Sequence, residues 1–412
     1  MKHLGIYLPN EANQHSIIKG IFDNTFLKNH VDLSGLYGEL FSIQTIEKYV
    51  EEELKHDHYL VTSNENSSLG SMSSGQQRKH LLTFIISQKP QFIVLDDIFG
   101  STDKATQALT IKALQEIAAK TLLIQVFYRK TDMLHCIDTV LIVDKQQSIK
   151  AVLPSADFKQ TNVTNWQAVE IVLPNLYGDK KQYINPLVAF KHVSVQYNNK
   201  PILNDICWEI QTGEFWQLIG PIGSGKSTLL SMITGDNPKA YGQNLILFGQ
   251  KKGTGETVWD IKKQIGYFTP TMIAQYTRND TVENMLISGL VDSVGLYVIP
   301  TELQRRTAHA WMQLLGKSFQ HKTYNQLTFG QQRILMVARA MIKHPPLLIL
   351  DEPTVGLDDE HAALFVNLIN SIALHRKLAI IYVSHRPEPG LNPEKVFELL
   401  PSEEGSIGQC IF

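Results

Sequence analysis

Residues 220–228 read Gly-Pro-Ile-Gly-Ser-Gly-Lys-Ser-Thr, and they decide the fold of the region around them. The apolar stretch Phe215–Ile219 precedes them and predicts a strand, and the run Leu229–Ile233 follows them and predicts a helix. Glycines between a strand and a helix let backbone N–H groups turn inward around an anion, and the helix N-terminus adds partial positive charge. The pattern predicts a loop that binds nucleotide phosphates, with a glycine-rich turn without a ligand as the alternative.

The residues of this loop have separate expected tasks. Lys226 is expected to bridge the β- and γ-phosphates of ATP, and the Ser227 hydroxyl is expected to bind Mg²⁺. The predicted ATP-binding residues of the loop are Gly220, Pro221, Ile222, Gly223, Ser224, Gly225, Lys226, Ser227 and Thr228.

Further polar residues lie next to predicted strands. Asp351 ends the apolar run 347–350, at the strand edge where open α/β sheets bind ligands, so we expect it to hold Mg²⁺. Glu352 is the candidate general base for the attacking water. The alternative is that residues 351–353 form an Asp-Glu-Pro turn that is exposed to solvent and has no catalytic role. His385 is a candidate contact to the γ-phosphate and Tyr197 a candidate base-stacking residue; a structural histidine and a core tyrosine are the alternatives.

The same order of landmarks occurs twice in the chain. Residues 73–78, Ser-Ser-Gly-Gln-Gln-Arg, match residues 328–333, Thr-Phe-Gly-Gln-Gln-Arg, and each is followed by a helical pattern and an apolar strand that ends in Asp. Each copy alternates strand and helix patterns, which predicts an α/β domain on a mostly parallel sheet. The prolines and polar residues of 154–184 predict a linker, so the expected domains are 1–153 and 185–412.

Composition excludes several classes of protein. The chain has 412 residues and a net charge of -2, so it has no clear nucleic-acid surface. Its three cysteines lie far apart, and their spacing predicts neither a disulfide framework nor a zinc site. No apolar run approaches the ~18 residues that a membrane helix needs. We expect a cytoplasmic protein that reaches the inner face of a membrane only through a partner.

Together, the phosphate loop, the Gly-Gln-Gln-Arg signatures, the Asp-Glu pair and the terminal His resemble the ATP-binding cassette ATPases over essentially the whole chain. The resemblance implies a P-loop NTPase fold with two tandem ABC ATPase domains, each a RecA-like core plus a helical subdomain. It also implies hydrolysis of ATP with Mg²⁺. Residues 253–267 and Trp216 are similar to two-cassette members whose name implies association with molybdate uptake, although no residue here points to molybdenum itself.

Two features depart from the family pattern. The second signature reads Leu327-Thr328-Phe329 before its Gly-Gln, where the family has LSGGQ. After residues 265–268, transporter cassettes usually carry a Gln that touches Mg²⁺ and the permease-facing loop, whereas this chain reads Thr-Pro-Thr. Gln275 is the candidate substitute. The missing Gln argues against conventional coupling to a permease.

The first copy is expected to be degenerate. When Pro9 is aligned with the proline of the phosphate loop, Gln14 falls at the Lys position, and Glu11 and Asn13 replace glycines. Such a loop lacks the backbone freedom, the cation and the Mg²⁺ hydroxyl, so we predict that it does not bind ATP productively. Its helical subdomain is also expected to be shortened, because the two motifs that bracket it lie closer together than in the second copy.

The signature of the first copy stays close to the family pattern. Cassettes of the family pair head to tail, so the resemblance implies that copy one contacts the ATP held by copy two. The residues predicted for that contact are Ser73, Ser74, Gly75, Gln76 and Asp103. A solvated Ser/Gly turn without such a role is the alternative.

Four functions fit these motifs. The first is an ATPase with one composite site that drives a conformational cycle on a protein partner. The second is the ATPase subunit of an importer that docks on a membrane permease. The third is a twin-cassette translation factor, against which the short linker and the balanced charge argue. The fourth is a nucleotide-gated binding protein in which Glu352 is idle.

Overall fold

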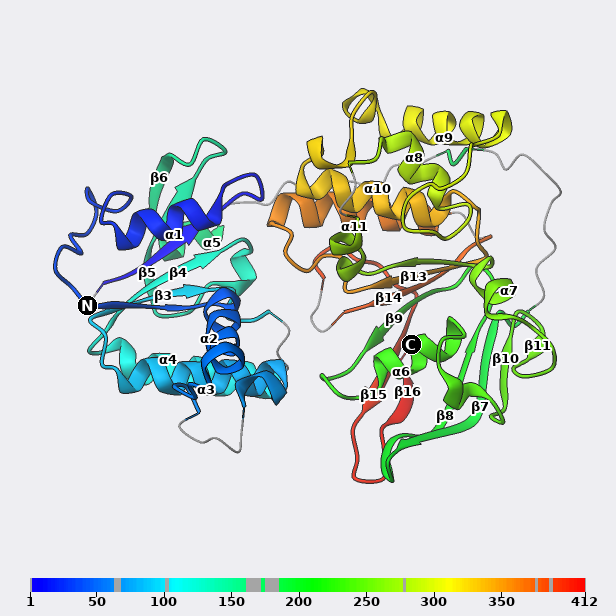
Figure 1. The fold of residues 1–412 in the computed structure, drawn as a ribbon, viewed down its shortest axis with the longest axis horizontal. Coiled ribbons are helices and arrows are strands. Elements are labelled where there is room, and N and C mark those ends of the chain that lie inside the picture. The colour runs from blue at the N-terminus through cyan, green and yellow to red at the C-terminus, as the bar shows by residue number, and fades with distance from the viewer. Residues whose placement is uncertain are drawn as a thin grey trace. The chain divides into compact units, whose positions relative to one another are not determined.

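The computed structural model describes residues 2–62, 68–100, 104–160, 172–174, 185–276, 279–374, 377–384 and 388–411. The chain forms two compact units (Figure 1). The first contains Met1–Thr164 with the short segment Gly356–Glu360, and the second contains Asn165–Val355 with His361–Phe412.

The first unit is built on a six-stranded sheet in the order β2-β3-β4-β1-β5-β6. All neighbours are parallel except β5 and β6, which are antiparallel. The strands are β1 (His3–Tyr7), β2 (Gly38–Phe41), β3 (Phe92–Asp96), β4 (Leu122–Phe127), β5 (Ile137–Val143) and β6 (Ile149–Pro154). The helices are α1 (Gln14–Phe22), α2 (Ile43–His56), α3 (Ser74–Ser87), α4 (Lys104–Ala118) and α5 (Ser155–Gln160), with short 3-10 turns η1 (Leu69–Ser71) and η2 (Lys130–Asp132).

Both faces of this sheet are covered, because strand residues alternate between two buried clusters. Ile124 and Val126 of β4 pack with the apolar side of α1. Leu123 and Phe127 of the same strand pack into the second cluster with residues of α2 and α3. Fully buried parallel strands of this kind favour continuous apolar sequence, which β3 has up to Asp96 and β4 has apart from the buried Gln125.

The second unit repeats the same sheet order, β12-β13-β14-β9-β15-β16. It adds a four-stranded antiparallel sheet, β11-β10-β7-β8. The strands are β7 (Val188–Tyr197), β8 (Lys200–Ile210), β9 (Phe215–Ile219), β10 (Leu245–Leu247), β11 (Gln250–Lys251), β12 (Ile265–Phe268), β13 (Leu347–Asp351), β14 (Ala379–Val383), β15 (Lys395–Leu400) and β16 (Ile407–Ile411). The helices are α6 (Lys226–Ile233), α7 (Val258–Lys262), α8 (Val282–Ser288), α9 (Glu302–Leu315), α10 (Phe329–Met341) and α11 (Asp359–Ala373), with 3-10 turns η3 (Pro238–Ala240), η4 (Pro270–Gln275), η5 (Lys317–Phe319) and η6 (Tyr324–Gln326).

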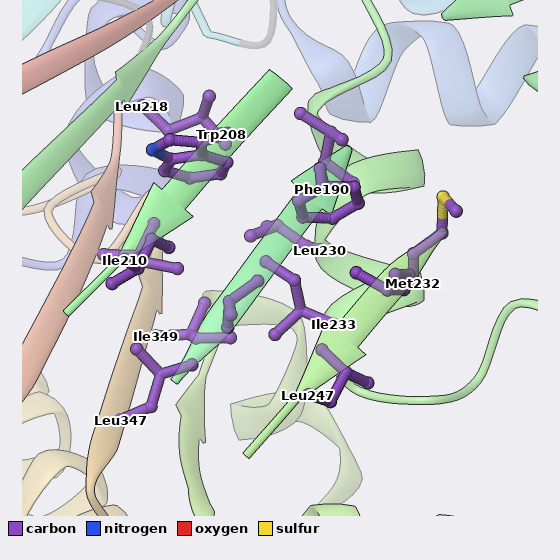
Figure 2. Packing of buried hydrophobic residues seen from close by; sticks show 14 of the residues in the cluster. Phe190, Trp208, Ile210, Leu218, Leu230, Met232, Ile233, Leu247, Leu347 and Ile349 are labelled. Carbon is purple, nitrogen blue, oxygen red and sulfur yellow. The ribbon is translucent and has the colours of Figure 1, made fainter. Parts of the chain in front are cut away.

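One apolar cluster joins the two sheets and α6 of the second unit (Figure 2). Trp208 of β8 stacks on Phe397 of β15 at a centroid distance of 4.4 Å and meets Trp216 of β9 edge-on at 5.7 Å. Leu230 and Ile233 of α6 complete the cluster. Packing of α6 in this cluster fixes the helix that follows the loop after β9.

The start of the predicted linker differs from the prediction. Residues 155–160 form α5, and its Phe158 is only 1% exposed. The ring packs against Tyr7 at 5.1 Å and Phe127 at 6.0 Å. These residues therefore belong to the first core, whereas most of the remaining linker lies outside the described residues.

The predicted α/β fold with two tandem cassettes is confirmed. The helical subdomain of the second unit lies between β12 and β13, and the corresponding stretch between β2 and β3 is shorter, as expected. Within the described ranges, no helix combines the length and apolarity that crossing a bilayer requires.

Candidate functional site

The loop after β9 needs its glycines for both conformation and packing. Gly220, Gly223 and Gly225 have φ values of 153°, 80° and 92°, which disfavour any residue with a side chain. A Cβ at Gly220 would lie 2.9 Å from the Leu399 carbonyl oxygen, and one at Gly225 would lie 2.6 Å from a methyl carbon of Leu203. The predicted strand and helix are both present, and α6 begins directly after Gly225.

Lys226 is the only cation of this loop, and its side chain points back into it. Its Nζ donates to the carbonyl oxygens of Gly220 at 2.6 Å and Pro221 at 2.9 Å, and the residue is 7% exposed. Burial lowers the pKa of Lys226 to about 8, although the carboxylates of Glu352 and Asp351 oppose the shift. A poorly solvated ammonium near two carboxylates is suited to exchange its carbonyl partners for phosphate oxygens.

The remaining hydroxyl groups of the loop differ in environment. Ser227 is exposed and Thr228 is half-buried, whereas Ser224 is fully buried and its Oγ has no hydrogen-bond partner among the described residues. The loop thus presents an exposed hydroxyl, a buried unsatisfied one and a cation beside turned-in backbone. This donor set fits a nucleotide with a hard divalent cation.

Asp351 and Glu352 lie at the carboxyl end of β13, as predicted, and both are half-buried. The Tyr267 hydroxyl donates to Asp351 Oδ2 at 3.3 Å, and burial together with Asp351 raises the pKa of Tyr267 above its usual range. The Glu352 N–H donates to the Val383 carbonyl of β14 at 3.0 Å. These bonds anchor the turn that carries the two carboxylates.

Glu352 also has a left-handed backbone, with φ at 51°. Asp97, at the same place after β3 in the first unit, has φ at 45°. Left-handed backbone at a non-glycine residue costs of order 1–3 kcal/mol, so it persists only where the surroundings impose it. Because both units share the conformation, it belongs to the turn itself and not to catalysis alone.

The two signature motifs begin their helices in the same way. Ser73 caps α3 with Gln76 as its reciprocal partner, and Thr328 caps α10 with Gln331. Their glycines differ in surroundings. Among the residues that the structure describes, a Cβ at Gly75 would meet only Thr106, at 3.6 Å, which is ordinary contact. A Cβ at Gly330 would lie 1.9 Å from the ring of His361.

In the first unit, side chains fill the position that corresponds to the phosphate loop. Gln14 donates from Nε2 to Asp96 Oδ1 and accepts from the Tyr128 hydroxyl at 3.0 Å. Burial raises the pKa of Asp96 to about 7, and repulsion from the nearby Asp97 carboxylate adds to this shift. Asn13 caps α1 by accepting from the Ser16 N–H at 3.1 Å, so an ordinary helix cap replaces the left-handed glycine of the second unit.

Tyr197 ends β7, and the residue is 38% exposed. Its hydroxyl donates to Asn237 Oδ1 at 3.1 Å, and the Lys239 ammonium lies 5.9 Å from the ring centroid. The hydrogen bond fixes the hydroxyl end of the partly exposed side chain, and base stacking by Tyr197 stays a prediction. Four predicted features lie outside the described residues: Asp103, His385, and the side chains of Ser74 and Gln275.

Arg333, which follows the second signature, is a buried residue for which the sequence motifs predict no role. Arg333 is 3% exposed; its guanidinium donates to the Val355 carbonyl at 2.9 Å and lies 4.8 Å from the centroid of Phe329. Burial lowers the pKa of Arg333 to about 10. The repeated Gln-Gln-Arg was the signal that could have singled it out, because Arg78 at the same place in the first unit contacts Asp97 at 3.3 Å.

The sheet order, the glycine loop after the central strand and the Asp that ends β13 define a P-loop NTPase with two tandem cassettes. Residues 203–355 match the family model described as ABC transporter. The chain is 32% identical over 204 residues to the uncharacterized ABC transporter ATP-binding protein YmeB of Lactococcus lactis, a match that covers 49% of this chain and 78% of YmeB. The chain belongs to the ABC transporter ATP-binding family, and it is an ATP-hydrolysing enzyme.

Two further comparisons extend over both units. The ABC transporter ATP-binding protein ModF of Escherichia coli is 29% identical over 399 residues, which cover 90% of this chain and 79% of ModF. Among solved structures, the archaeal ribosome recycling factor aABCE1, in complex with ribosomal stalk protein aP1, has a TM-score of 0.61 at 13% identity. That match covers 99% of this chain and 85% of the other and shows a shared fold.

Proposed function

We propose that the protein hydrolyses Mg-ATP at a single composite site, formed by the phosphate loop of the second cassette and the signature of the first. The observation that carries this proposal is the asymmetry between the units. The second unit has Lys226 in a glycine loop, whereas the first has the network of Gln14, Asp96 and Tyr128 at that place. Conversely, Gly75 is sterically open and Gly330 is not.

In the second unit, different residues bind the phosphates, the base and Mg²⁺ and catalyse hydrolysis. Backbone N–H groups of 220–228 and the Lys226 ammonium hold the phosphates, and the Tyr197 ring stacks on the base. Ser227 and Asp351 hold Mg²⁺, which neutralises charge on the phosphate oxygens. Glu352 orients the attacking water and accepts its proton, while His385 contacts the γ-phosphate.

In the nucleotide-bound state, the N-terminus of α3 completes the site. Ser73, Ser74, Gly75, Gln76 and Asp103 contribute from the first cassette. Free N–H groups at the start of a helix stabilise the negative charge of a phosphate, and a glycine there allows close approach. The first cassette thus has a function in hydrolysis, although its own loop lacks the lysine and glycines that bind ATP.

Steady-state ATPase of Gly75→Asp tests the arrangement. A carboxylate about 4 Å from a phosphate costs about 4 kcal/mol at an effective dielectric of about 20. Hydrolysis should therefore fall by about 100-fold or more, with little change in ATP binding to the second cassette. Thr83→Asp adds the same charge on the exposed part of α3 and should be mild. An equal loss in the two variants would refute the composite site.

The second candidate function is docking on a protein partner, such as a membrane permease. An exposed apolar surface of the helical subdomain favours it: Val291, Val294, Tyr297, Val298, Ile299 and Leu303 are each 40–91% exposed. Association with molybdate uptake rests on the sequence resemblance of residues 253–267. Glu352→Gln loaded with ATP should capture the partner, and Ile299→Asp in the same background should release it. Retention by Ile299→Asp would exclude this surface.

A further inference from the structure

The outer face of the antiparallel sheet in the second unit gathers three side chains with metal-binding atoms. His192 lies on β7, and Asp205 and Cys207 lie on β8. Their Nδ1, carboxylate oxygen and Sγ atoms all lie within 4.8 Å of one another. No site in the nucleotide mechanism uses any of them.

The strand geometry explains why these residues meet. On β8, Ile206, Trp208 and Ile210 point into the core, so Asp205 and Cys207 point to solvent. On β7 the pairing shifts register between Phe190 and Val193, which pair with Trp208 and Ile206. Two residues of β7 therefore stand opposite Cys207 alone, as in a β-bulge.

The bulge brings His192 over the thiol. Its backbone is left-handed, with φ at 55°, and its N–H donates to Cys207 Sγ at 3.4 Å. Its ring Nδ1 lies 3.6 Å from that sulfur and 2.8 Å from Asp205 Oδ1. The sulfur, the ring nitrogen and the carboxylate oxygen therefore lie within reach of a single ion.

We propose that His192, Asp205 and Cys207 form a binding site for Zn²⁺ with one coordination position left to water. Bonds of about 2.3 Å to sulfur and about 2.0 Å to nitrogen or oxygen place tetrahedral ligands roughly 3.3–3.6 Å apart. The observed sulfur–nitrogen distance fits that range, and the nitrogen–oxygen pair opens slightly once the ion replaces the proton between them. Thiolate, imidazole and carboxylate together are the donor set of a borderline cation, and not of Mg²⁺ or Ca²⁺.

The exposure of the site makes it accessible to an ion from solution. The side chains of His192 and Asp205 are 78% and 64% exposed, and Cys207 is exposed as well. Binding would tie the bulge of β7 to β8, in the sheet that packs Trp208 against the nucleotide-binding core. The cysteine spacing in sequence cannot reveal such a site, because its ligands come from two strands and include only one thiol.

The test titrates the full chain, reduced and in excess Mg²⁺, with Co²⁺ as a spectroscopic substitute for Zn²⁺. We expect one tightly bound ion per chain, with a thiolate-to-cobalt charge-transfer band that Zn²⁺ abolishes by competition. Cys207→Ser should remove the band and weaken Zn²⁺ binding by ~100-fold or more, since losing even a hydrogen bond to a ligand costs about 10–100-fold. Asp205→Asn should weaken binding and keep the band.

Cys136→Ser and Cys410→Ser are the matched controls, because each removes one of the other two thiols and should leave the band intact. Zn²⁺ should also raise the melting temperature of the parent chain and not that of Cys207→Ser, since a ligand of the folded state stabilises it. ATPase activity of Cys207→Ser should be unchanged without Zn²⁺, which shows that the variant folds. A band that survives in Cys207→Ser, or no thiolate band in the parent chain, would overturn the proposal.

Discussion

Glu352 brings a half-buried carboxylate next to Asp351 on a turn that two backbone bonds hold. If it accepts the proton of the attacking water, Glu352→Gln should bind Mg-ATP normally and hydrolyse it ~10²–10⁴-fold more slowly. Phosphate release and equilibrium nucleotide binding measure the two effects separately. Glu403→Gln, which neutralises an exposed carboxylate before β16, is the control. Unchanged turnover in Glu352→Gln would remove this residue from the mechanism.

Lys226 should take up a proton when the nucleotide binds. Burial lowers its pKa to about 8 from the usual 10.5, so between these values the unfolded chain holds a proton that the folded chain lacks. The free energy of unfolding therefore increases as the pH rises from about 8 to 10.5. Below about pH 8, the buried ammonium destabilises the fold most. Phosphate oxygens favour the charged form and raise the pKa again.

Calorimetry near pH 8.5 in two buffers of different ionisation enthalpy measures this proton uptake. The parent chain should show it, and Lys226→Arg should not, because arginine keeps its charge throughout. The same uptake in both chains would assign the proton to another group.

For single residues, the sequence predicted which residues matter more readily than it predicted their hydrogen-bond partners. The glycines at 220, 223 and 225 indicate a backbone with positive φ, because few other residues adopt it. The partners of Gln14 are 82 and 114 residues away in sequence, and only the folded sheet brings them together.

Helices α3 and α10 start with the same kind of cap. They differ in the side chain next to the signature glycine, which is Thr106 at Gly75 and His361 at Gly330. Gly330→Ala should destabilise the protein by about 1–3 kcal/mol, because its Cβ would overlap the His361 ring. Gly75→Ala should change stability little. Urea unfolding compares them, and His361→Ala should rescue Gly330→Ala. Equal losses without rescue would show that the contact is not the cause.

Apolar periodicity predicted β3, β13 and the helices after both signatures, since long regular patterns outweigh local exceptions. It missed α5, a single short helix with one buried aromatic residue, Phe158. It could not foresee the bulge of β7 either, because a shift in pairing leaves no mark on composition.

Across the whole chain, the two sheets share one strand order, but α6 begins with Lys226 after a glycine loop, whereas α1 begins with Gln14 after an asparagine cap. The matched landmarks of the sequence predicted the repeat and its α/β class. The order of the strands was not predictable from those landmarks, because it depends on which strand each crossover places in the centre. The fold of the first unit is thus preserved while its nucleotide loop is not.

This asymmetry predicts one tight Mg-ATP site per chain. Lys226→Ala removes an ammonium that should bond phosphate oxygens, and a bond to a charged group is worth about 1.5–3 kcal/mol, so binding should weaken by about 10–100-fold. Gln14→Ala, the matched change in the first unit, should leave both affinity and stoichiometry unaltered. Gln14→Lys should not create a second site, because the residues before it form a helix cap instead of a glycine loop. Isothermal calorimetry of the parent chain and the three variants measures the affinity and the stoichiometry of Mg-ATP binding. Two sites of similar affinity in the parent chain would show that the first cassette binds ATP.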